Sequence, residues 1–328
     1  MSAAEPLRPA QPRVYEAALE ALGRYLAEQG YHFITPTPLT HQRNLDLRPG
    51  LATDLRGAFG WNRSFAPDLL PVELFEQLRA AAVIAERSPG QWRSTLRCSS
   101  LGAMRLFHSA YPTDAADAVF FGPDTYRFAR CIQAHLAQRP VAPKTAVDIG
   151  CGSGAGGLVV ATTCPQAKVW GTDINDNALA LSKLNAKLAG AANLQPRFSN
   201  VLRELEGQFD LIVANPPYMQ DPQGRAYRDG GGGMGSGLSL RILSEALERL
   251  APGGTLLLYT GVAIVDGKDV FLEGDRALEG ARTRLEGFAG QWRYQELDPD
   301  VFGEDLDQPG YAGAERIAVV LLEATRQG

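Results

Sequence analysis

From Thr145 onward, short apolar runs alternate with segments of helical periodicity, and this alternation constrains the fold more than any other feature. It is typical of repeated βα units, in which helices cover a sheet of parallel strands. The pattern does not extend into the first 110 residues. We therefore predict a large α/β domain over residues 111–328 and a smaller domain over residues 1–110.

The first 110 residues carry signals for a mainly helical module. The first dozen residues lack periodicity and are expected to be flexible. The remaining patterns predict helices over residues 14–26 and 71–87 and strands over residues 92–99 and 103–108. Helices followed by a hairpin resemble a winged helix. That fold binds nucleic acid in some proteins and protein partners in others, and the near-balanced charge of this segment favours the second use.

A glycine-rich turn follows the first predicted strand, Thr145–Ile149. It contains Gly150, Gly152 and Gly154, and a helix is predicted to begin near Gly156. Glycines supply positive φ values and let the backbone pass close to a ligand, so the order strand, turn and helix predicts a nucleoside cofactor site. The spacing also approaches the dinucleotide fingerprint of NAD enzymes.

Acidic residues near this turn decide between the two kinds of cofactor. Asp148 precedes the first glycine by two residues, where a carboxylate accepts hydrogen bonds from an amino-acid ammonium but repels a pyrophosphate. Asp173 ends the second predicted strand and is expected to hold both ribose hydroxyls, with helix capping as the alternative. Asn200, at the end of the third strand, is a candidate acceptor for the adenine amino group or a turn residue.

The fourth predicted strand, Phe209–Ala214, delivers the turn Asn215-Pro216-Pro217-Tyr218 to the sheet edge at which open α/β folds bind ligands. Two consecutive prolines end the strand and hold the chain extended. The Asn215 side-chain oxygen and the Pro216 carbonyl offer two acceptors to an NH2 group, and Tyr218 offers an aromatic face to stack on it. The turn therefore predicts a nitrogen nucleophile as the acceptor.

Taken together, these motifs resemble class I S-adenosylmethionine (SAM)-dependent methyltransferases with an Asn-Pro-Pro-Tyr motif, in particular the protein-glutamine N5-methyltransferases. The resemblance spans roughly residues 110–328. It implies a seven-stranded, Rossmann-like α/β fold, SAM as cofactor, and a SAM-binding catalytic domain over residues 111–328. It also implies that Phe121 and Thr125 lie against the cofactor and acceptor. The segment Phe121-Gly-Pro-Asp-Thr125 departs from the Pro-Arg-Pro-Glu-Thr-Glu stretch usual in that family.

The predicted activity is methyl transfer from SAM to a nitrogen, chiefly that of a protein amide or a small-molecule amine, with a nucleobase amine as the remaining acceptor class. The alternative is cyclisation of SAM itself to azetidine-2-carboxylate with release of methylthioadenosine, as in the synthases that resemble methyltransferases. Positioning of the nitrogen supplies most of the catalysis in the first case, because the sulfonium is already a strong methylating agent.

Charge and composition narrow the partners. Net charge is −5, with about +2 in residues 1–140 and about −7 in the remainder. This balance argues against a nucleic-acid substrate. The four cysteines show no metal-ligand spacing, so no metal site is predicted. No apolar run approaches the roughly 18 residues of a membrane span, so we expect a cytoplasmic protein. An acidic segment containing Asp298, Asp305 and Asp307 is expected to be a solvated loop, and Phe302 and Tyr311 suggest that it closes over the acceptor.

Overall fold

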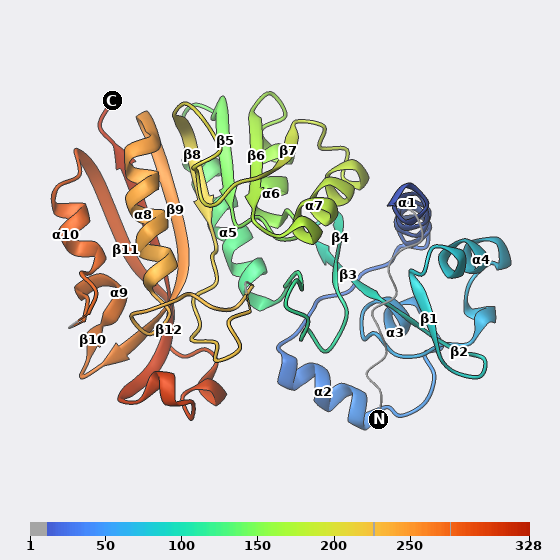
Figure 1. The fold of residues 1–328 in the computed structure, drawn as a ribbon. Helices are drawn as coiled ribbons and strands as arrows, with labels where there is room; N and C mark the ends of the chain where they lie inside the picture. Colours follow the sequence, from blue (N-terminus) through green and yellow to red (C-terminus); the bar gives the residue numbers. More distant parts are fainter. Residues whose placement is uncertain (1–11, 226, 276) are drawn as a thin grey trace. The chain divides into compact units, whose positions relative to one another are not determined.

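The structure is a computed structural model that describes residues 12–328 except 226 and 276 (Figure 1). The predicted flexible start therefore lies almost wholly outside the described residues. Contacts divide the chain into two compact units. The first contains the described residues up to Asp114, with Val119–Asp124 and Leu184–Gly190, and the second contains the rest. The domain boundary at residue 110 stays a prediction.

Besides the ends of two helices of the second unit, the described residues of the first unit form four α-helices, a 3-10 helix and two antiparallel hairpins. The helical elements are α1 (Pro12–Glu28), α2 (Pro38–Leu47), α3 (Leu55–Phe59), η1 (Pro67–Leu69) and α4 (Val72–Ala80). The hairpins are β1 (Ile84–Ser88) with β2 (Gln91–Ser94), and β3 (Leu96–Leu101) with β4 (Met104–Ser109). Helix α1 confirms the helix predicted over residues 14–26. The winged-helix likeness stays a prediction.

Two predicted elements of the first unit are wrong in extent. The helix predicted over residues 71–87 ends at Ala80, because Ala82 adopts a positive φ of 56° and Ile84 begins a strand. Gly90, with a φ of 70°, lies in the turn of the hairpin that follows. The strand predicted over residues 92–99 is divided at Thr95 into β2 and β3, which belong to different sheets.

The second unit is built on one mixed sheet. Its strands are β5 (Thr145–Ile149), β6 (Lys168–Asp173), β7 (Leu194–Phe198), β8 (Phe209–Ala214), β9 (Leu250–Val265), β10 (Lys268–Asp269), β11 (Gly290–Asp298) and β12 (Ala314–Arg326). Its helical elements are α5 (Pro123–Gln138), which begins in the first unit, α6 (Ala155–Thr163), α7 (Asp176–Leu188), which ends there, α8 (Gly237–Arg249), α9 (Val270–Glu273), α10 (Ala281–Glu286), η2 (Gly303–Asp305) and η3 (Pro309–Tyr311).

The strand order of this sheet is β11-β12-β9-β8-β5-β6-β7, with the short β10 paired to β9. The five strands from β9 to β7 pair in parallel, and β12 runs antiparallel to both of its neighbours. These seven strands, with α6 and α8 packed against them, confirm the predicted seven-stranded, Rossmann-like class I methyltransferase fold.

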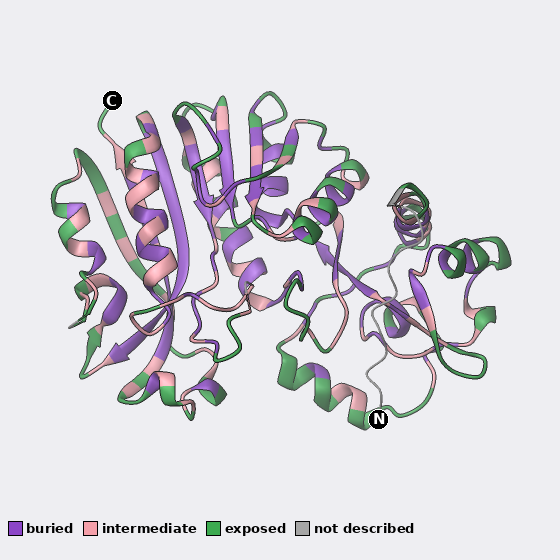
Figure 2. Cartoon of the chain, viewed as in Figure 1, coloured by how far each residue is buried: buried purple, intermediate pink, exposed green. Residues whose placement is uncertain are grey.

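The core of the second unit lies on the central strands, which Figure 2 shows as almost continuously buried. Val147 of β5 and Ile212 of β8 are fully buried, and Leu243 of α8 packs into the same cluster. Continuous apolar strands are expected where helices cover both faces of a parallel sheet.

Among the helices that the structure describes, none combines the length and the apolar character of a membrane span.

Candidate functional site

The predicted site residues of the second unit lie at the carboxyl ends of adjacent strands. In the sheet register, Ile149 of β5 pairs with Thr172 of β6 on one side and with Ala214 of β8 on the other. The next residues along these strands are Gly150, Asp173 and Asn215. Because neighbouring strands lie about 4.8 Å apart, the glycine turn is flanked by the acidic strand end and by the proline turn.

The glycine turn requires glycine at three positions. Gly150, Gly152 and Gly154 have φ values of 68°, 51° and 85°, a region that L side chains rarely adopt. At Gly154 the space is also closed, because a Cβ atom there would lie 2.6 Å from the Ser182 Oγ. The turn is fixed to β6 by a hydrogen bond of 2.9 Å from the Cys151 N–H to the Thr172 carbonyl.

Asp148 is a buried carboxylate with one oxygen still available. Its Oδ2 accepts a hydrogen bond of 2.7 Å from the Gly157 N–H in the first turn of α6. Its Oδ1 has no hydrogen-bond partner among the described residues. Burial raises the pKa of Asp148 to about 7, opposed by the Gly157 N–H and reinforced by the nearby charge of Asp173. A cation at Oδ1 would favour the ionised form.

Asp173 joins the strand end to the glycine turn. Its Oδ2 accepts from the Gly152 N–H at 3.0 Å, and its Oδ1 accepts from the Asn175 N–H at 2.9 Å. Burial raises its pKa, against these backbone hydrogen bonds. The cap of α7 is instead provided by Asn175, whose Oδ1 accepts from the Asn177 N–H. Each Asp173 oxygen retains a lone pair, so the carboxylate can still accept from hydroxyl groups.

The proline turn leaves a polar side chain unpaired at the sheet edge. Asn215 is half-buried, and its amide has no hydrogen-bond partner among the described residues. Pro216 is buried and Pro217 is half-buried. Because neither proline carries an N–H, the backbone hydrogen bonds of β8 cannot continue through the turn. The Asn215 side chain therefore lies beyond the end of the strand. An amide held here can both donate and accept hydrogen bonds.

Tyr218 serves as packing for this turn. Its side chain is 7% exposed, and its ring lies against the backbone of Gly261 in β9, where a Cβ atom would approach within 2.2 Å. The Tyr218 and Phe302 rings make an edge contact, with their centroids 6.1 Å apart. These contacts orient the ring, and its predicted stacking on an acceptor amine stays a prediction.

Comparison of the sequence with known proteins places the chain in a family. The family model for the methyltransferase small domain matches residues 128–262. A release factor glutamine methyltransferase of Bordetella pertussis is 32% identical over 60% of this chain and 74% of its own length. The chain belongs to the methyltransferase family of the release factor glutamine methyltransferases.

Other relatives share shorter stretches with this chain. A release factor glutamine methyltransferase of Deinococcus radiodurans is 37% identical over 38% of this chain and 49% of its own length. A ribosomal RNA small subunit methyltransferase C of Mannheimia succiniciproducens is 37% identical over 40% of this chain and 37% of its own length. The chain thus spans about half the length of the first of the curated relatives it matches. SAM is the methyl donor of this family.

Three further predicted residues lie on other parts of the fold. The Asn200 Oδ1 accepts a 2.7 Å hydrogen bond from Arg241, and its N–H donates to Glu204 in a turn. Thr125 lies in the first turn of α5 and is buried. Phe121 belongs to the first unit, where its ring stacks on His108 at 5.0 Å. Their contacts with a cofactor stay predictions.

Two apolar side chains, which the sequence motifs do not identify, lie at the same edge of the sheet. Ile174, directly after β6, is 53% exposed, and Phe198, which pairs with Asp173 in the register of β7, is 50% exposed. Large apolar groups at strand ends beside a nucleoside-type turn suit the faces of an aromatic base. Their signal in the sequence is the apolar residue adjacent to each strand terminus.

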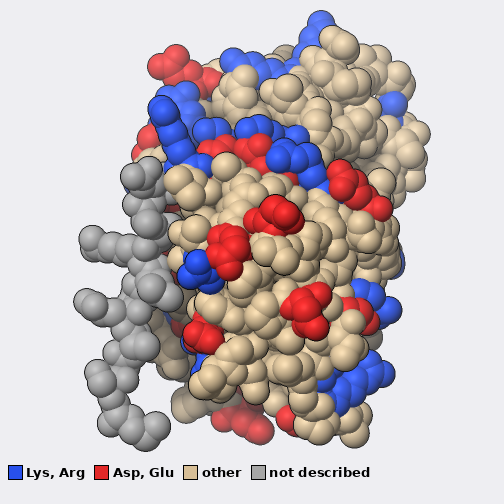
Figure 3. Space-filling view, turned by 90° about the vertical axis from the view of Figure 1, so that its right-hand side faces the viewer, with Lys and Arg blue, Asp and Glu red and all other residues tan. Residues whose placement is uncertain are grey.

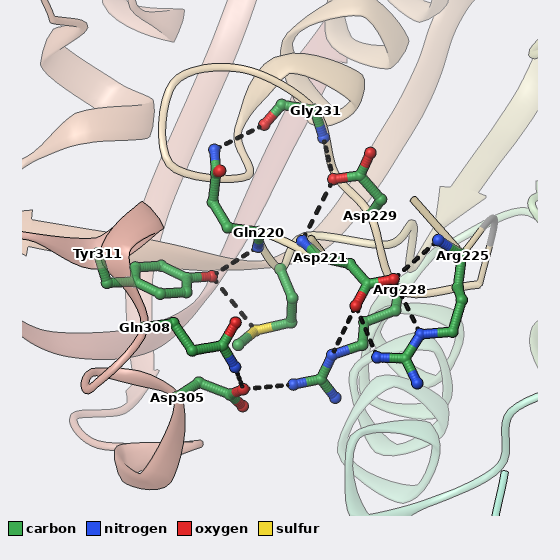
Figure 4. Close-up of polar contacts among 10 residues, drawn as sticks. Gln220, Asp221, Arg225, Arg228, Asp229, Gly231, Asp305, Gln308 and Tyr311 are labelled. Atoms are coloured by element: carbon green, nitrogen blue, oxygen red, sulfur yellow. Dashed lines mark hydrogen bonds and ion pairs between the residues drawn. The ribbon is translucent and has the colours of Figure 1, made fainter. Parts of the chain in front are cut away.

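A polar network holds the segment that follows Tyr218 (Figure 4). The Met219 N–H donates to the Arg228 carbonyl at 3.0 Å, and the Gly230 N–H donates to the Met219 carbonyl at 2.8 Å. Asp221 is buried and accepts from the Arg225 guanidinium through both of its oxygens. These bonds form a closed loop at the end of the proline turn.

The loop between β11 and β12 supports this segment from the other side. Arg228 donates to the Asp305 Oδ1 at 2.6 Å, and Gln308 contacts the same oxygen. The Gln220 N–H donates to the Tyr311 hydroxyl at 2.9 Å. Asp305 is 5% exposed, so the expectation of a solvated acidic loop is wrong at this residue: its charge is paired with an arginine. Asp298 is likewise paired, with Arg127.

The described residues contain no cluster of three or more histidine, cysteine, aspartate or glutamate side chains arranged to hold a metal ion. The four cysteines are all free thiols. Burial raises the pKa of Cys98 to about 12, so this thiol stays protonated.

Proposed function

We propose that this protein transfers the methyl group of SAM to the side-chain amide nitrogen of a glutamine in a protein substrate. The observation that carries the proposal is the unpaired amide of Asn215, held at the end of β8 beside the glycine turn of β5. In the reaction a nitrogen–carbon bond forms, the carbon–sulfur bond breaks and one proton leaves the nitrogen for solvent. When bound, SAM supplies the electrophilic methyl group.

The chain's own residues would hold the cofactor through complementary charges. The free Oδ1 of Asp148 accepts from the amino-acid ammonium, and Asp173 accepts from the ribose hydroxyls. Glycines 150 and 152 let the backbone pass close to the ligand, since neither φ value suits a residue with a side chain. Ile174 and Phe198 offer apolar contacts to the adenine, and the Nδ2 of Asn200 offers it a donor, because the Asn200 oxygen already accepts from Arg241.

Asn215 and Pro216 would hold the acceptor. The Asn215 side-chain oxygen and the Pro216 carbonyl accept hydrogen bonds from the two N–H groups of a primary amide. This aligns the nitrogen with the methyl carbon at about 3 to 3.5 Å, the separation of a reactive conformer. Tyr218 stiffens the turn through its contacts with Gly261 and Phe302. The residues position the nitrogen and need not act as acid or base.

A protein acceptor is favoured over a nucleobase for two reasons. Most of the relatives at the head of the comparison are named as release factor glutamine methyltransferases, and the residues after 140 carry a net charge of about −7. Negative charge around the catalytic domain disfavours approach of a polyanion. The relative named as a ribosomal RNA methyltransferase shows why the acceptor has to be tested directly.

The test measures which nucleoside is formed from SAM, S-adenosylhomocysteine or methylthioadenosine. The purified protein is incubated with SAM alone, then with a bacterial release factor and with a glutamine-to-asparagine variant of that factor, and nucleosides are separated by chromatography. The proposal expects S-adenosylhomocysteine and a singly methylated factor only with the native factor. Methylthioadenosine formed from SAM alone would instead identify the cyclisation to azetidine-2-carboxylate. Methylation of both factors would contradict a glutamine acceptor.

A further inference from the structure

The first unit contains a cavity rich in arginine that the methyltransferase chemistry does not use. Its volume is about 350 Å³, and its lining includes Arg48, Arg63 and Arg93 together with the polar side chains of Asn62, Ser64 and Gln91. None of the described residues that line it is acidic. An adjoining cavity of about 100 Å³ shares Arg48 and Arg63. Three cations therefore meet around one small volume.

Two of these guanidinium groups are held by neutral oxygens. Arg63 donates from Nη2 to the carbonyls of Gly50 at 3.0 Å and Leu51 at 3.3 Å. Arg93 donates from Nη2 to the Tyr111 carbonyl at 2.5 Å and to the Asn62 Oδ1 at 3.3 Å. Main-chain acceptors fix the position of each group without neutralising its charge.

No ion pair offsets the positive charge of the cavity within the described chain, although Asp54 lines the adjoining cavity together with Arg48 and Arg63. Arg48, Arg63 and Arg93 form no ion pair with any described carboxylate, although arginines elsewhere in both units do so, such as Arg79 with Glu76. Burial lowers the pKa of Arg93, and the neighbouring charge of Arg87 lowers it further. Both causes disfavour the charged state, which a bound anion would relieve.

We propose that this cavity is a binding site for a phosphate group. Guanidinium groups present planar pairs of donors that match phosphate oxygens, and two of the three here are already oriented. The volume is suited to one small ligand. On the face that Figure 3 shows, acidic side chains lie among the basic ones and much of the surface carries no charge. The cavity itself, with three guanidinium groups around one small volume, fits a single phosphate group.

A phosphate group has two sources, a small phosphorylated molecule and the backbone of a single-stranded polynucleotide. Titration calorimetry on the full chain without SAM distinguishes them, with inorganic phosphate, uridine 5′-monophosphate and a 12-nucleotide RNA lacking a terminal phosphate as probes. Uridine is chosen so that the probe does not offer an adenine to the cofactor site. Binding of the monophosphate alone identifies a small-molecule ligand. Binding of the RNA, with the arginine dependence described next, identifies the polynucleotide.

Arg48→Gln tests the cavity, and Arg43→Gln is the matched control. Both arginines are exposed and belong to the region of α2, but Arg43 does not line the cavity. We expect Arg48→Gln to weaken binding about tenfold, the loss of one charge-assisted hydrogen bond, and Arg43→Gln to leave it unchanged. Absence of binding by all three probes, or equal weakening by the two variants, would overturn the proposal. Because SAM is absent, neither result depends on the proposed activity.

Discussion

The glycine turn and the proline turn, at the two ends of the candidate site, differ in what their polar side chains bind. At the glycine turn, the groups expected to bind the cofactor also hold the fold together, because Asp148 and Asp173 both accept from backbone N–H groups of the turn and of α6. At the proline turn, the Asn215 amide is unpaired. The segment that follows it is supported by hydrogen bonds of Asp221, Arg228, Asp305 and Tyr311. Substitutions should therefore affect affinity and stability together at the first end, and turnover alone at the second.

The sharpest test of this comparison is Asn215→Ala. The variant removes an unpaired side chain and leaves the packing of Pro216 and Tyr218 in place, so we expect an unchanged melting temperature and SAM affinity. Turnover should fall about 10² to 10³-fold, as for loss of one group that orients the reacting atoms. Steady-state kinetics and SAM titration measure the two effects. Equal losses of both would show that Asn215 belongs to the cofactor end.

At the other end, Gly154→Ala should damage the fold. Its φ of 85° costs an L residue about 1–2 kcal/mol, and the contact of 2.6 Å with Ser182 adds about 1–3 kcal/mol of overpacking. Denaturant unfolding measures the sum. Gly150→Ala is the control, because its φ is 68° but no atom lies within 4 Å of its added Cβ, so only the first cost applies. Equal losses of stability in the two variants would show that the Ser182 side chain moves away from the added Cβ at no energetic cost.

The support behind the proline turn can be weakened without touching Asn215. Asp305→Asn removes the charge that Arg228 pairs with, and we expect turnover to fall about tenfold through misplacement of the turn. SAM affinity should stay constant. The matched control is Glu273→Gln, which breaks the exposed pair with Arg282 and should change neither quantity. A loss of SAM affinity in Asp305→Asn would contradict the separation of the two ends.

The smallest expected effect is a pH dependence of SAM affinity. The pKa of Asp148 is raised to about 7, so the carboxyl is mostly neutral at pH 6 and becomes ionised as the pH rises. The ionised form attracts the ammonium, so the dissociation constant should fall roughly five- to tenfold between pH 6 and pH 7.5. Asp148→Asn should bind more weakly with a flatter profile. A wild-type profile independent of pH would remove Asp148 from the ammonium site.

The second unit could be predicted from its sequence because its signals are local and agree with its tertiary structure. Thr145–Ile149 and Phe209–Ala214 are apolar runs bounded by glycine or proline, and both strands have the predicted bounds. In the first unit, local signals conflict. Residues 71–87 have helical spacing throughout, but the helix ends at Ala80 and Ala82 adopts a positive φ that no local pattern indicates.

Residues 32–71 show the same limit. No period indicated α2, although Thr37 caps its start, accepting from the Thr40 N–H, and Pro38 occupies its first turn. Those two residues are the signal that could have located the helix. In the site, spacing identified Asp148 and Asn215, whereas the pairing of Arg228 with Asp305 joins residues 77 positions apart and is visible only in the fold.

The position of bound S-adenosylhomocysteine is the most direct test of the proposed roles of Asp148, Asp173 and Asn215, and a crystal structure of that complex measures it. We predict that the amino-acid ammonium lies within hydrogen-bond distance of the Asp148 Oδ1, with the ribose hydroxyls on Asp173 and the sulfur facing the Asn215 amide. A nucleoside bound away from the glycine turn, or an Asn215 side chain paired within the protein and directed away from the sulfur, would contradict it.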